Sequence, residues 1–431
     1  MTQPAPSLAE LAGRFGVATD YQDWSGRRVN APESTLVAVL AAFGVAATSE
    51  SERAAALAAD ERAHWSRALP PTILGRAGAK TTFWVHVSHG QPAEVWLQLE
   101  DGTVRAGIRQ VDNFTAPFDL DGRLVGEASF VLPDDLPLGY HRVHLRSGAQ
   151  QVSAALIVTP GWLGVPERLG ARRSWGLAAQ LYSVRSRQSW GVGDLTDLTD
   201  LAVWSASVHG AGYVLVNPLH AAAPTAPMEP SPYLPTSRRF VNPLYLRVEA
   251  IPEFAYLRKR GRVRRLRDDV QKHAASLDAI DRDSAWAAKR AALKLVYSVP
   301  RTAGRELAYA AFCAREGAAL DDFAAWCALA EKYGDDWHQW PESVRHPGAD
   351  AWALQDVLAL GVSAGAPPDE FNQLGQDWSQ PPWRPDRLEE QEYQPFRALI
   401  RSVLRHAGGV RIDHIIGLFR LWWIPRGEAP T

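Results

Sequence analysis

The residues best suited to carry out chemistry are Arg411 and Asp413, which are two positions apart near the end of the sequence. Residues 410–413 alternate apolar and charged side chains after the helix-breaking pair Gly408-Gly409, which predicts a short strand. Alternate side chains of a strand share one face, so the guanidinium would lie beside the carboxylate and favour its ionised form. An ionised, fixed carboxylate is what a glycosyl nucleophile requires, although the same pair would equally buttress a strand without any catalytic role.

A strand at this position needs a sheet, and the middle of the sequence predicts one. Residues 176–182 form a buried strand pattern, residues 195–208 an amphipathic helix, and residues 213–216 a short β-branched strand. Strand, helix and strand in this order predict parallel strands joined by a right-handed crossover. In barrels built from such units the chemistry lies just beyond the strands' C-terminal ends, which here are residues 183–185 and 217–220.

Two other modules are expected before this α/β region. Residues 1–68 carry three helical patterns, the first capped by Ser7 and the others near residues 33–43 and 55–65. Residues 69–160 predict a β-sandwich, because short alternating strands recur between turn residues. These strands are expected at 82–87, 93–99, 127–132, 140–145 and 152–158, with a hairpin turn at Asp101-Gly102. Residues 161–431 would form the catalytic domain, with a helical subdomain at about 255–345.

Composition excludes several classes of function. The chain has 46% hydrophobic and 22% charged residues and a formal net charge of −2, so it lacks the field that would attract nucleic acid or an anionic membrane. The only cysteines are Cys313 and Cys327, which exclude a disulfide framework and a cysteine-rich metal site. No secretory signal is visible, and a reducing cytoplasm is the expected location. The seventeen tryptophans would serve core packing or sugar stacking.

Several motifs occur together in one order along the chain. The segment 410–414 is followed by Ile-Ile-Gly-Leu-Phe and Trp-Trp-Ile-Pro, and it resembles the nucleophile strand of the amylomaltases, 4-alpha-glucanotransferases of glycoside hydrolase family 77. Other matching stretches are 181–195, 217–220, 231–233, 242–245, 367–369 and 375–378. The resemblance covers nearly the whole chain. It implies an α/β fold with a partial TIM (β/α)8-type barrel and a helical insert, preceded by the helical segment and the β-sandwich.

The resemblance also implies a mechanism, in which Asp413 attacks the anomeric carbon and Arg411 orients and stabilises it. A glucan 4-hydroxyl then replaces water as the acceptor, which gives transfer with retention between alpha-1,4-glucans or maltooligosaccharides. No metal or organic cofactor is implied. The implied substrate-binding residues are Ser231 and Tyr233 at the cleavage point, Asp369 and Gln376 through sugar hydroxyls, Trp378 against a ring, and His414. For His414, sugar contact and simple packing beside the strand are both open, as are spacer and glucan-binding roles for the β-sandwich.

The chain departs from the family pattern in two places. The family's general acid glutamate and a further sugar-holding aspartate follow the nucleophile strand, and the sequence stops at Thr431 before both. Residues 343–348 also run directly into 349–353, where family members place a helix and a barrel strand. We therefore expect a truncated form with little or no transferase activity. A related alpha-glucan hydrolase or branching enzyme, and a catalytically dead glucan-binding or degenerate protein, are the alternative hypotheses.

Overall fold

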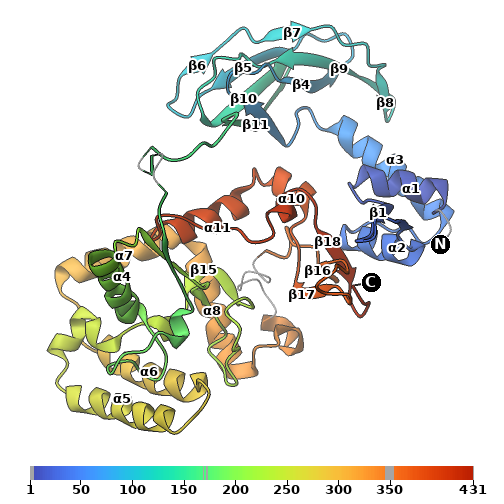
Figure 1. The fold of residues 1–431 in the computed structure, drawn as a ribbon. Coiled ribbons are helices and arrows are strands. Elements are labelled where there is room, and N and C mark those ends of the chain that lie inside the picture. Colours follow the sequence, from blue (N-terminus) through green and yellow to red (C-terminus); the bar gives the residue numbers. More distant parts are fainter. Residues whose placement is uncertain (1–3, 168, 171–172, 345–353, 431) are drawn as a thin grey trace. The chain divides into compact units, whose positions relative to one another are not determined.

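The structure is a computed structural model that describes residues 4–167, 169–170, 173–344 and 354–430 (Figure 1). The chain divides into two compact units. The first unit comprises Met1–Arg168, Asp356–Arg397 and Ile412–Thr431, and the second comprises Leu169–Gln355 and Ala398–Arg411. Among the described residues, no helix has the length and apolar character needed to cross a membrane.

The first unit begins with three helices and a two-stranded ribbon. In chain order they are α1 (Pro6–Arg14), β1 (Asp20–Gln22), β2 (Arg28–Asn30), α2 (Glu33–Ala42) and α3 (Glu50–Ser66). The apolar spacing of α1 and α2 buries Leu8, Leu11, Leu36 and Leu40 in a common core, as amphipathic helices require. The three predicted helices are confirmed.

The predicted cap at Ser7 is wrong. Pro6 is the first residue of α1, and Ala5 occupies the cap position without a side-chain hydrogen bond. Proline suits this position because its missing N–H would be unpaired there in any case. The Ser7 hydroxyl instead donates to Glu50 Oε2 at 2.6 Å and so ties α1 to the start of α3.

A β-sandwich follows, drawn as the cyan and teal sheets of Figure 1. One sheet has the order β3 (Thr72–Arg76), β11 (Gln150–Thr159), β10 (Gly139–Ser147), β5 (Glu94–Gln98) and β6 (Val104–Arg105). The other has the order β4 (Thr82–Ser88), β9 (Arg123–Val131) and β7 (Arg109–Val111), and β8 (Phe118–Leu120) also pairs with β9. Alternating side chains from both sheets, including Val85, Leu97, Val143 and Leu156, are fully buried between them. The predicted strands and the Asp101-Gly102 turn are confirmed.

The second unit contains the predicted strand–helix–strand motif. Strand β12 (Gly176–Ala179) pairs in parallel with β13 (Tyr213–Val216), and α4 (Leu195–His209) connects them. Asp194 caps α4 by accepting from Thr196 N and Asp197 N, and Gly210 ends it in the left-handed conformation at φ 67°. A side chain at Gly176 would meet the Tyr213 carbonyl oxygen at 2.3 Å, so glycine is required for this strand pairing.

The predicted third barrel strand at 410–413 does not form. Residues 410–412 have no regular secondary structure, and residues 413 and 414 form a bend. Among the residues that the structure describes, the β12–β13 sheet has two strands. An isolated segment has no neighbour to accept and donate its backbone hydrogen bonds, so its alternating pattern alone does not make it a strand. The two apolar residues of this segment, Val410 and Ile412, are 43% and 44% exposed. Of the expected barrel units, the described residues form one parallel strand pair and its connecting helix.

This pair leaves apolar side chains uncovered. On α4, Val203, Trp204 and Val208 are between 51% and 63% exposed, and Tyr213 and Leu215 of β13 are 54% and 37% exposed. A parallel sheet is normally covered by helices on both faces. The exposure is what an open fragment of a larger sheet would show.

Most of the remaining second unit is helical, as predicted for residues 262–340. The helices are α5 (Arg260–Ala275), α6 (Arg282–Tyr297), α7 (Ala303–Glu316) and α8 (Ala318–Tyr333), with a short antiparallel pair β14 (His220–Ala221) and β15 (Ser237–Val241) before them. The 3-10 helices of this unit are η1 (Leu181–Ser183), η2 (Pro243–Tyr245), η3 (Val248–Ala250), η4 (Pro252–Tyr256), η5 (Trp337–Gln339) and η6 (Glu342–Val344).

The later part of the chain adds a small antiparallel sheet to the first unit. Its order is β17 (Gln376–Gln380), β16 (Val362–Ala366) and β18 (Trp422–Pro425). The helices α10 (Pro385–Glu390) and α11 (Gln394–Leu404) and the 3-10 helix η7 (Ile415–Leu418) lie between β17 and β18 in the sequence. Trp423 of β18 stacks on Phe43 with ring centroids 5.1 Å apart, and Trp422 meets Tyr21 edge-on at 4.8 Å. These tryptophans therefore pack the sheet against the N-terminal helices.

Candidate active site

Strand β17 brings two of the predicted substrate-binding residues together. Gln376 and Trp378 are two positions apart and share one face of the strand, and Trp378 Nε1 donates to Gln376 Oε1 at 2.9 Å. The neighbouring strand β16 approaches closely at Gly365, where a Cβ would lie 2.0 Å from the Gln376 carbonyl oxygen. The glycine therefore fixes the distance at which β16 supports β17.

His414 connects this strand to Asp413. Its backbone is in the left-handed region at φ 51° and ψ 50°, and its carbonyl oxygen accepts from Gly417 N at 2.8 Å as η7 begins. Its ring stacks on Trp378 with centroids 4.4 Å apart and planes inclined by 29°. Its Nε2 lies 3.9 Å from Asp413 Oδ2. A continuous series of contacts thus runs from Gln376 through Trp378 and His414 to Asp413.

Asp413 and His414 both face the surface. The side chain of Asp413 is 69% exposed and that of His414 is 53% exposed, whereas Gln376 and Trp378 are half-buried. The arrangement presents an aromatic platform beside an accessible carboxylate. Such a pairing suits a sugar ring, since the ring packs on aromatic faces while its reactive carbon meets an oxygen nucleophile.

Asp369 has a structural task that the sequence did not reveal. Its Oδ1 accepts from the backbone N–H groups of Phe371 at 2.8 Å and Asn372 at 2.6 Å, an arrangement that closes a turn around the carboxylate. The turn presents Phe371, which is 96% exposed, and Leu374, which is 77% exposed. Sequence analysis missed these two residues; the available signal was a pair of large apolar side chains inside a Pro- and Gly-containing loop.

Ser231, Tyr233 and Arg411 belong to the second unit. Tyr233 N donates to Ser231 Oγ at 3.3 Å, Ser231 N donates to Glu229 Oε1 at 2.7 Å, and the Tyr233 side chain is 62% exposed. The structure therefore brings Ser231 and Tyr233 together as predicted. The predicted strand face that was to place Arg411 beside Asp413 is absent, because the strand itself does not form.

His220 lies in the lining of a small pocket that also contains Ser231, Tyr182 and Tyr245. Burial, with a smaller contribution from Arg238, lowers the pKa of His220 from 6.5 to about 4. At neutral pH its imidazole is therefore uncharged. No partner for this histidine could be predicted from the sequence, because Tyr182 and Tyr245 of the pocket lining are far from it in the chain.

A buried ionic cluster supports the loop that follows β12. The Arg247 guanidinium contacts Asp194 and donates to Asp197 Oδ1 at 2.9 Å, and all three side chains are at most 6% exposed. Asp197 Oδ2 also accepts from Ser189 Oγ at 2.7 Å. Arg247 therefore holds Asp194, the residue that caps α4. The hydrogen bond of Ser189 to Asp197 attaches the loop between β12 and α4 to the same cluster.

Two protein-family models match this chain. The family model described as 4-alpha-glucanotransferase, glycoside hydrolase family 77, matches residues 179–347 and 343–431. The model described as the MalQ N-terminal beta sandwich domain matches residues 68–160. The two models between them cover the sandwich, helix α4, strand β13 and every nominated site residue.

Individual proteins give the same pattern. Proteins named 4-alpha-glucanotransferase from Mycobacterium tuberculosis and Mycobacterium bovis are each 66% identical over 494 residues, covering all of this chain and 68% of the relative. A 4-alpha-glucanotransferase from Haemophilus influenzae is 29% identical over 383 residues, covering 71% of this chain and 54% of the relative. The crystal structure of amylomaltase from Corynebacterium glutamicum matches with a TM-score of 0.89 and 41% identity, covering 98% of this chain and 67% of that one.

The same comparisons reveal an internal gap. The 494 aligned positions exceed the 431 residues of this chain by 63, so the mycobacterial relatives contain residues without a counterpart here. The family model matches in two pieces that share residues 343–347, which locates a break in the correspondence there. This agrees with the missing segment expected at 343–353, of which residues 345–353 lie outside the described part of the chain.

Proposed function

Because this chain belongs to the 4-alpha-glucanotransferase family, glycoside hydrolase family 77, we propose that the surface formed by Gln376, Trp378, His414 and Asp413 is the nucleophile side of its glucan-transfer site. The function of the family is transfer of alpha-1,4-glucan segments. The single observation that carries the proposal is the stack of His414 on Trp378, since it places an aromatic platform directly beside the exposed Asp413 carboxylate.

In the proposed reaction, Asp413 attacks the anomeric carbon of a bound glucan and the bond to the leaving 4-oxygen breaks. The leaving oxygen takes a proton from a second carboxyl group, a role that we assign to none of the nominated residues. The 4-hydroxyl of an acceptor sugar then gives its proton to that second carboxylate, attacks the β-glycosyl ester and releases the Asp413 carboxylate, so two inversions leave the linkage retained. Arg411 would orient the nucleophile and stabilise its negative charge.

The substrate contacts follow from the side chains. Trp378 would pack on a sugar ring, and His414 would both hold the indole and reach a sugar hydroxyl from its exposed edge. Gln376 would hydrogen-bond sugar hydroxyls beside them, as would Asp369 from its loop. Ser231 and Tyr233 would bind the sugar at the cleavage point. Alpha-1,4-glucans and maltooligosaccharides are the proposed substrates.

A second candidate function is glucan binding without turnover, and the internal gap favours it for the chain as it stands. We propose that β12, α4 and β13 are the first barrel units, and that the strand pair remains open because the residues that would continue the sheet are absent. A barrel closes only when every strand is present. We therefore expect weak transfer activity from this sequence.

Covalent trapping tests the nucleophile. The chain, and the same chain carrying the missing segment of the Mycobacterium tuberculosis relative at 343–353, would be incubated with a 5-fluoro-alpha-glucosyl fluoride and digested for mass spectrometry. A glucosyl adduct on the peptide with Asp413 is expected in at least the restored form. An adduct on another carboxylate, or transfer by an Asp413→Ala variant at an undiminished rate, contradicts the proposal.

A further inference from the structure

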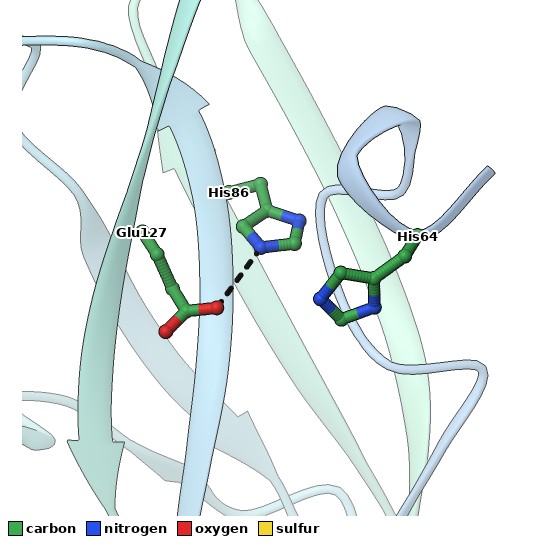
Figure 2. A group of neighbouring side chains, drawn as sticks. All are labelled: His64, His86 and Glu127. Carbon is green, nitrogen blue, oxygen red and sulfur yellow. Dashed lines mark hydrogen bonds and ion pairs between the residues drawn. The ribbon is translucent and has the colours of Figure 1, made fainter. Parts of the chain in front are cut away.

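Three potential metal ligands from separate elements converge at the edge of the β-sandwich. His64 comes from α3, His86 from β4 and Glu127 from β9, and one ligand atom of each lies within 4.8 Å of the other two. Figure 2 shows the carboxylate of Glu127 and the ring of His64 on either side of the His86 nitrogen that faces Glu127. The cluster lies within the first unit and is separate from the residues around Asp413.

The hydrogen bond of His86 to the Arg67 carbonyl oxygen determines which of its ring nitrogens carries the hydrogen. Its Nδ1 lies 2.8 Å from the Arg67 carbonyl oxygen, which only accepts, so Nδ1 carries the hydrogen. In the neutral ring, Nε2 then presents a lone pair to Glu127 Oε2 at 3.2 Å. Two acceptors at this distance repel unless a positive species, either a proton or a metal ion, lies between them.

Hydrogen bonds also fix the orientation of the Glu127 carboxylate. Its Oε1 accepts from Asn113 Nδ2 at 2.8 Å and from Thr115 Oγ1 at 2.9 Å, which leaves Oε2 directed at His86. Asn113 Nδ2 also donates to Ser129 Oγ at 2.7 Å, which fixes the amide that orients the carboxylate. Hydrogen bonds that fix the tautomer of a histidine and the orientation of a carboxylate are typical of the surroundings of metal ligands.

The ring of His86 is also held in one orientation by its neighbours. It is 2% exposed and stacks between Trp65, with centroids 4.5 Å apart, and Trp84, at 4.3 Å. A proton shared between His86 and Glu127 is the alternative that the experiment must distinguish from a metal ion. His64 distinguishes the two, because a metal ion would bind it as a third ligand, whereas a proton shared by His86 and Glu127 would not.

His64 is the adjustable member of the cluster. It is exposed near the end of α3, its ring centroid lies 5.0 Å from that of His86, and a small movement of its side chain would bring a nitrogen to the shared point.

We propose that His64, His86 and Glu127 form a binding site for a divalent transition-metal ion of the Zn²⁺ type. Two imidazoles and a carboxylate, with a fourth position open to water, are a common donor set for Zn²⁺. Two nitrogen donors disfavour Ca²⁺ and Mg²⁺, which prefer oxygen. The ion would link α3 to β4 and β9, two neighbouring strands of one sheet, which suggests a structural role rather than a part in glycosyl transfer.

Direct binding tests the site in the full chain, freed of any polyhistidine tag and treated with a chelator. Titration with Zn²⁺ followed by calorimetry is expected to give one site per chain, and Co²⁺ is expected to give the visible absorption of a four-coordinate ion. His64→Ala and Glu127→Gln should each weaken Zn²⁺ binding at least about 30-fold and abolish the Co²⁺ spectrum, since each removes one ligand. His89→Ala, at an exposed histidine of the same sandwich, is the matched control and should bind as the parent does.

Thermal unfolding gives a second readout. Zn²⁺ should raise the Tm of the parent and of His89→Ala, because an ion that binds only the folded state stabilises it, and EDTA should reverse the shift. The same ion should not raise the Tm of His64→Ala, whose exposed side chain can be removed without disturbing the fold. Zn²⁺ affinity or a Tm shift that survives in His64→Ala would overturn the proposal, as would the absence of stoichiometric binding in the parent.

Discussion

The imidazole of His414 lies against the indole of Trp378, with centroids 4.4 Å apart and planes inclined by 29°. This stack joins the segment that carries Asp413 to strand β17, although 35 positions separate Trp378 from Asp413 in the sequence. It is a contact between side chains alone, since no strand pairing holds residues 410–414. An aromatic contact therefore helps to position Asp413, the proposed nucleophile.

Removing the stack should weaken glucan binding. We expect His414→Ala to reduce the affinity for maltoheptaose about 5-fold, in line with the roughly 0.5–1.5 kcal/mol of a favourable aromatic pair. His414→Phe keeps a stacking ring and should retain most of the affinity. Isothermal titration of the three proteins measures this. Equal affinity of the parent and His414→Ala would show that the stack has no part in binding.

The features predicted from the sequence are those set by local patterns. The helix expected at 195–208 and the strands expected at 82–87 and 213–216 each depend on neighbouring residues, and each was confirmed. The strand expected at 410–413 failed because strand formation depends on a partner elsewhere in the chain. The cluster around His86 was not found, because its ligands come from three elements and have no characteristic spacing.

The site residues divide in the same way. The face shared by Gln376 and Trp378 follows from their spacing in one strand, and the contact between Tyr233 and Ser231 follows from their proximity in sequence. The stack of His414 on Trp378 could be found only in the three-dimensional structure. The same holds for the turn around Asp369, since the sequence shows a carboxylate but not the backbone N–H groups that surround it.

Gly365→Ala tests the support that β16 gives to β17. The added methyl group would meet the Gln376 carbonyl oxygen at 2.0 Å and Ile424 Cδ1 at 2.5 Å, so the strands must separate. Overpacking of this kind costs about 1–3 kcal/mol, and we expect a lower Tm together with weaker maltoheptaose binding. Gly13→Ala is the control, because nothing lies within 4 Å of its Cβ, and it should be neutral or stabilising. An unchanged Tm for Gly365→Ala would mean that this close approach is not maintained in solution.

His220 should make stability depend on pH. Its pKa is about 4 in the folded chain and about 6.5 in the unfolded chain, so the unfolded state binds more protons between these values. The stabilisation is complete above pH 6.5 and is lost as the pH falls toward 4, by about 3 kcal/mol over the whole interval. Urea unfolding at pH 7 and pH 5 should show a smaller difference for His220→Gln than for the parent. His209→Gln, at an exposed position of α4, controls for the loss of a histidine, and equal pH differences in all three proteins would refute the assignment.

The buried cluster at Arg247 should be costly to break. Arg247→Ala would leave the Asp194 and Asp197 carboxylates buried without their counter-ion, and removal of one partner from such a pair costs about 3–5 kcal/mol. Chemical unfolding of the second unit measures the loss. Arg62→Ala breaks an exposed ion pair with Asp121 and should change stability within the error of the measurement. Equal effects of the two substitutions would show that burial of the Arg247 cluster has no energetic consequence.

Restoring the internal segment is the most informative change. The chain has 63 fewer residues than its alignment with the mycobacterial relatives, and the break falls at 343–347, while Trp204 and Val208 of α4 stay exposed in the existing fold. Insertion of the relative's segment should continue the parallel sheet, cover these side chains and lower the binding of the hydrophobic dye ANS. A segment of equal length rich in Gly and Ser is the control, because it lengthens the chain without supplying a strand or helix. Maltotriose disproportionation should increase at least about 10-fold with the relative's segment alone. If the Gly/Ser control raised activity equally, chain length rather than sheet completion would be the cause. If neither insertion changed ANS binding, the exposed face of α4 would not be where the absent residues pack.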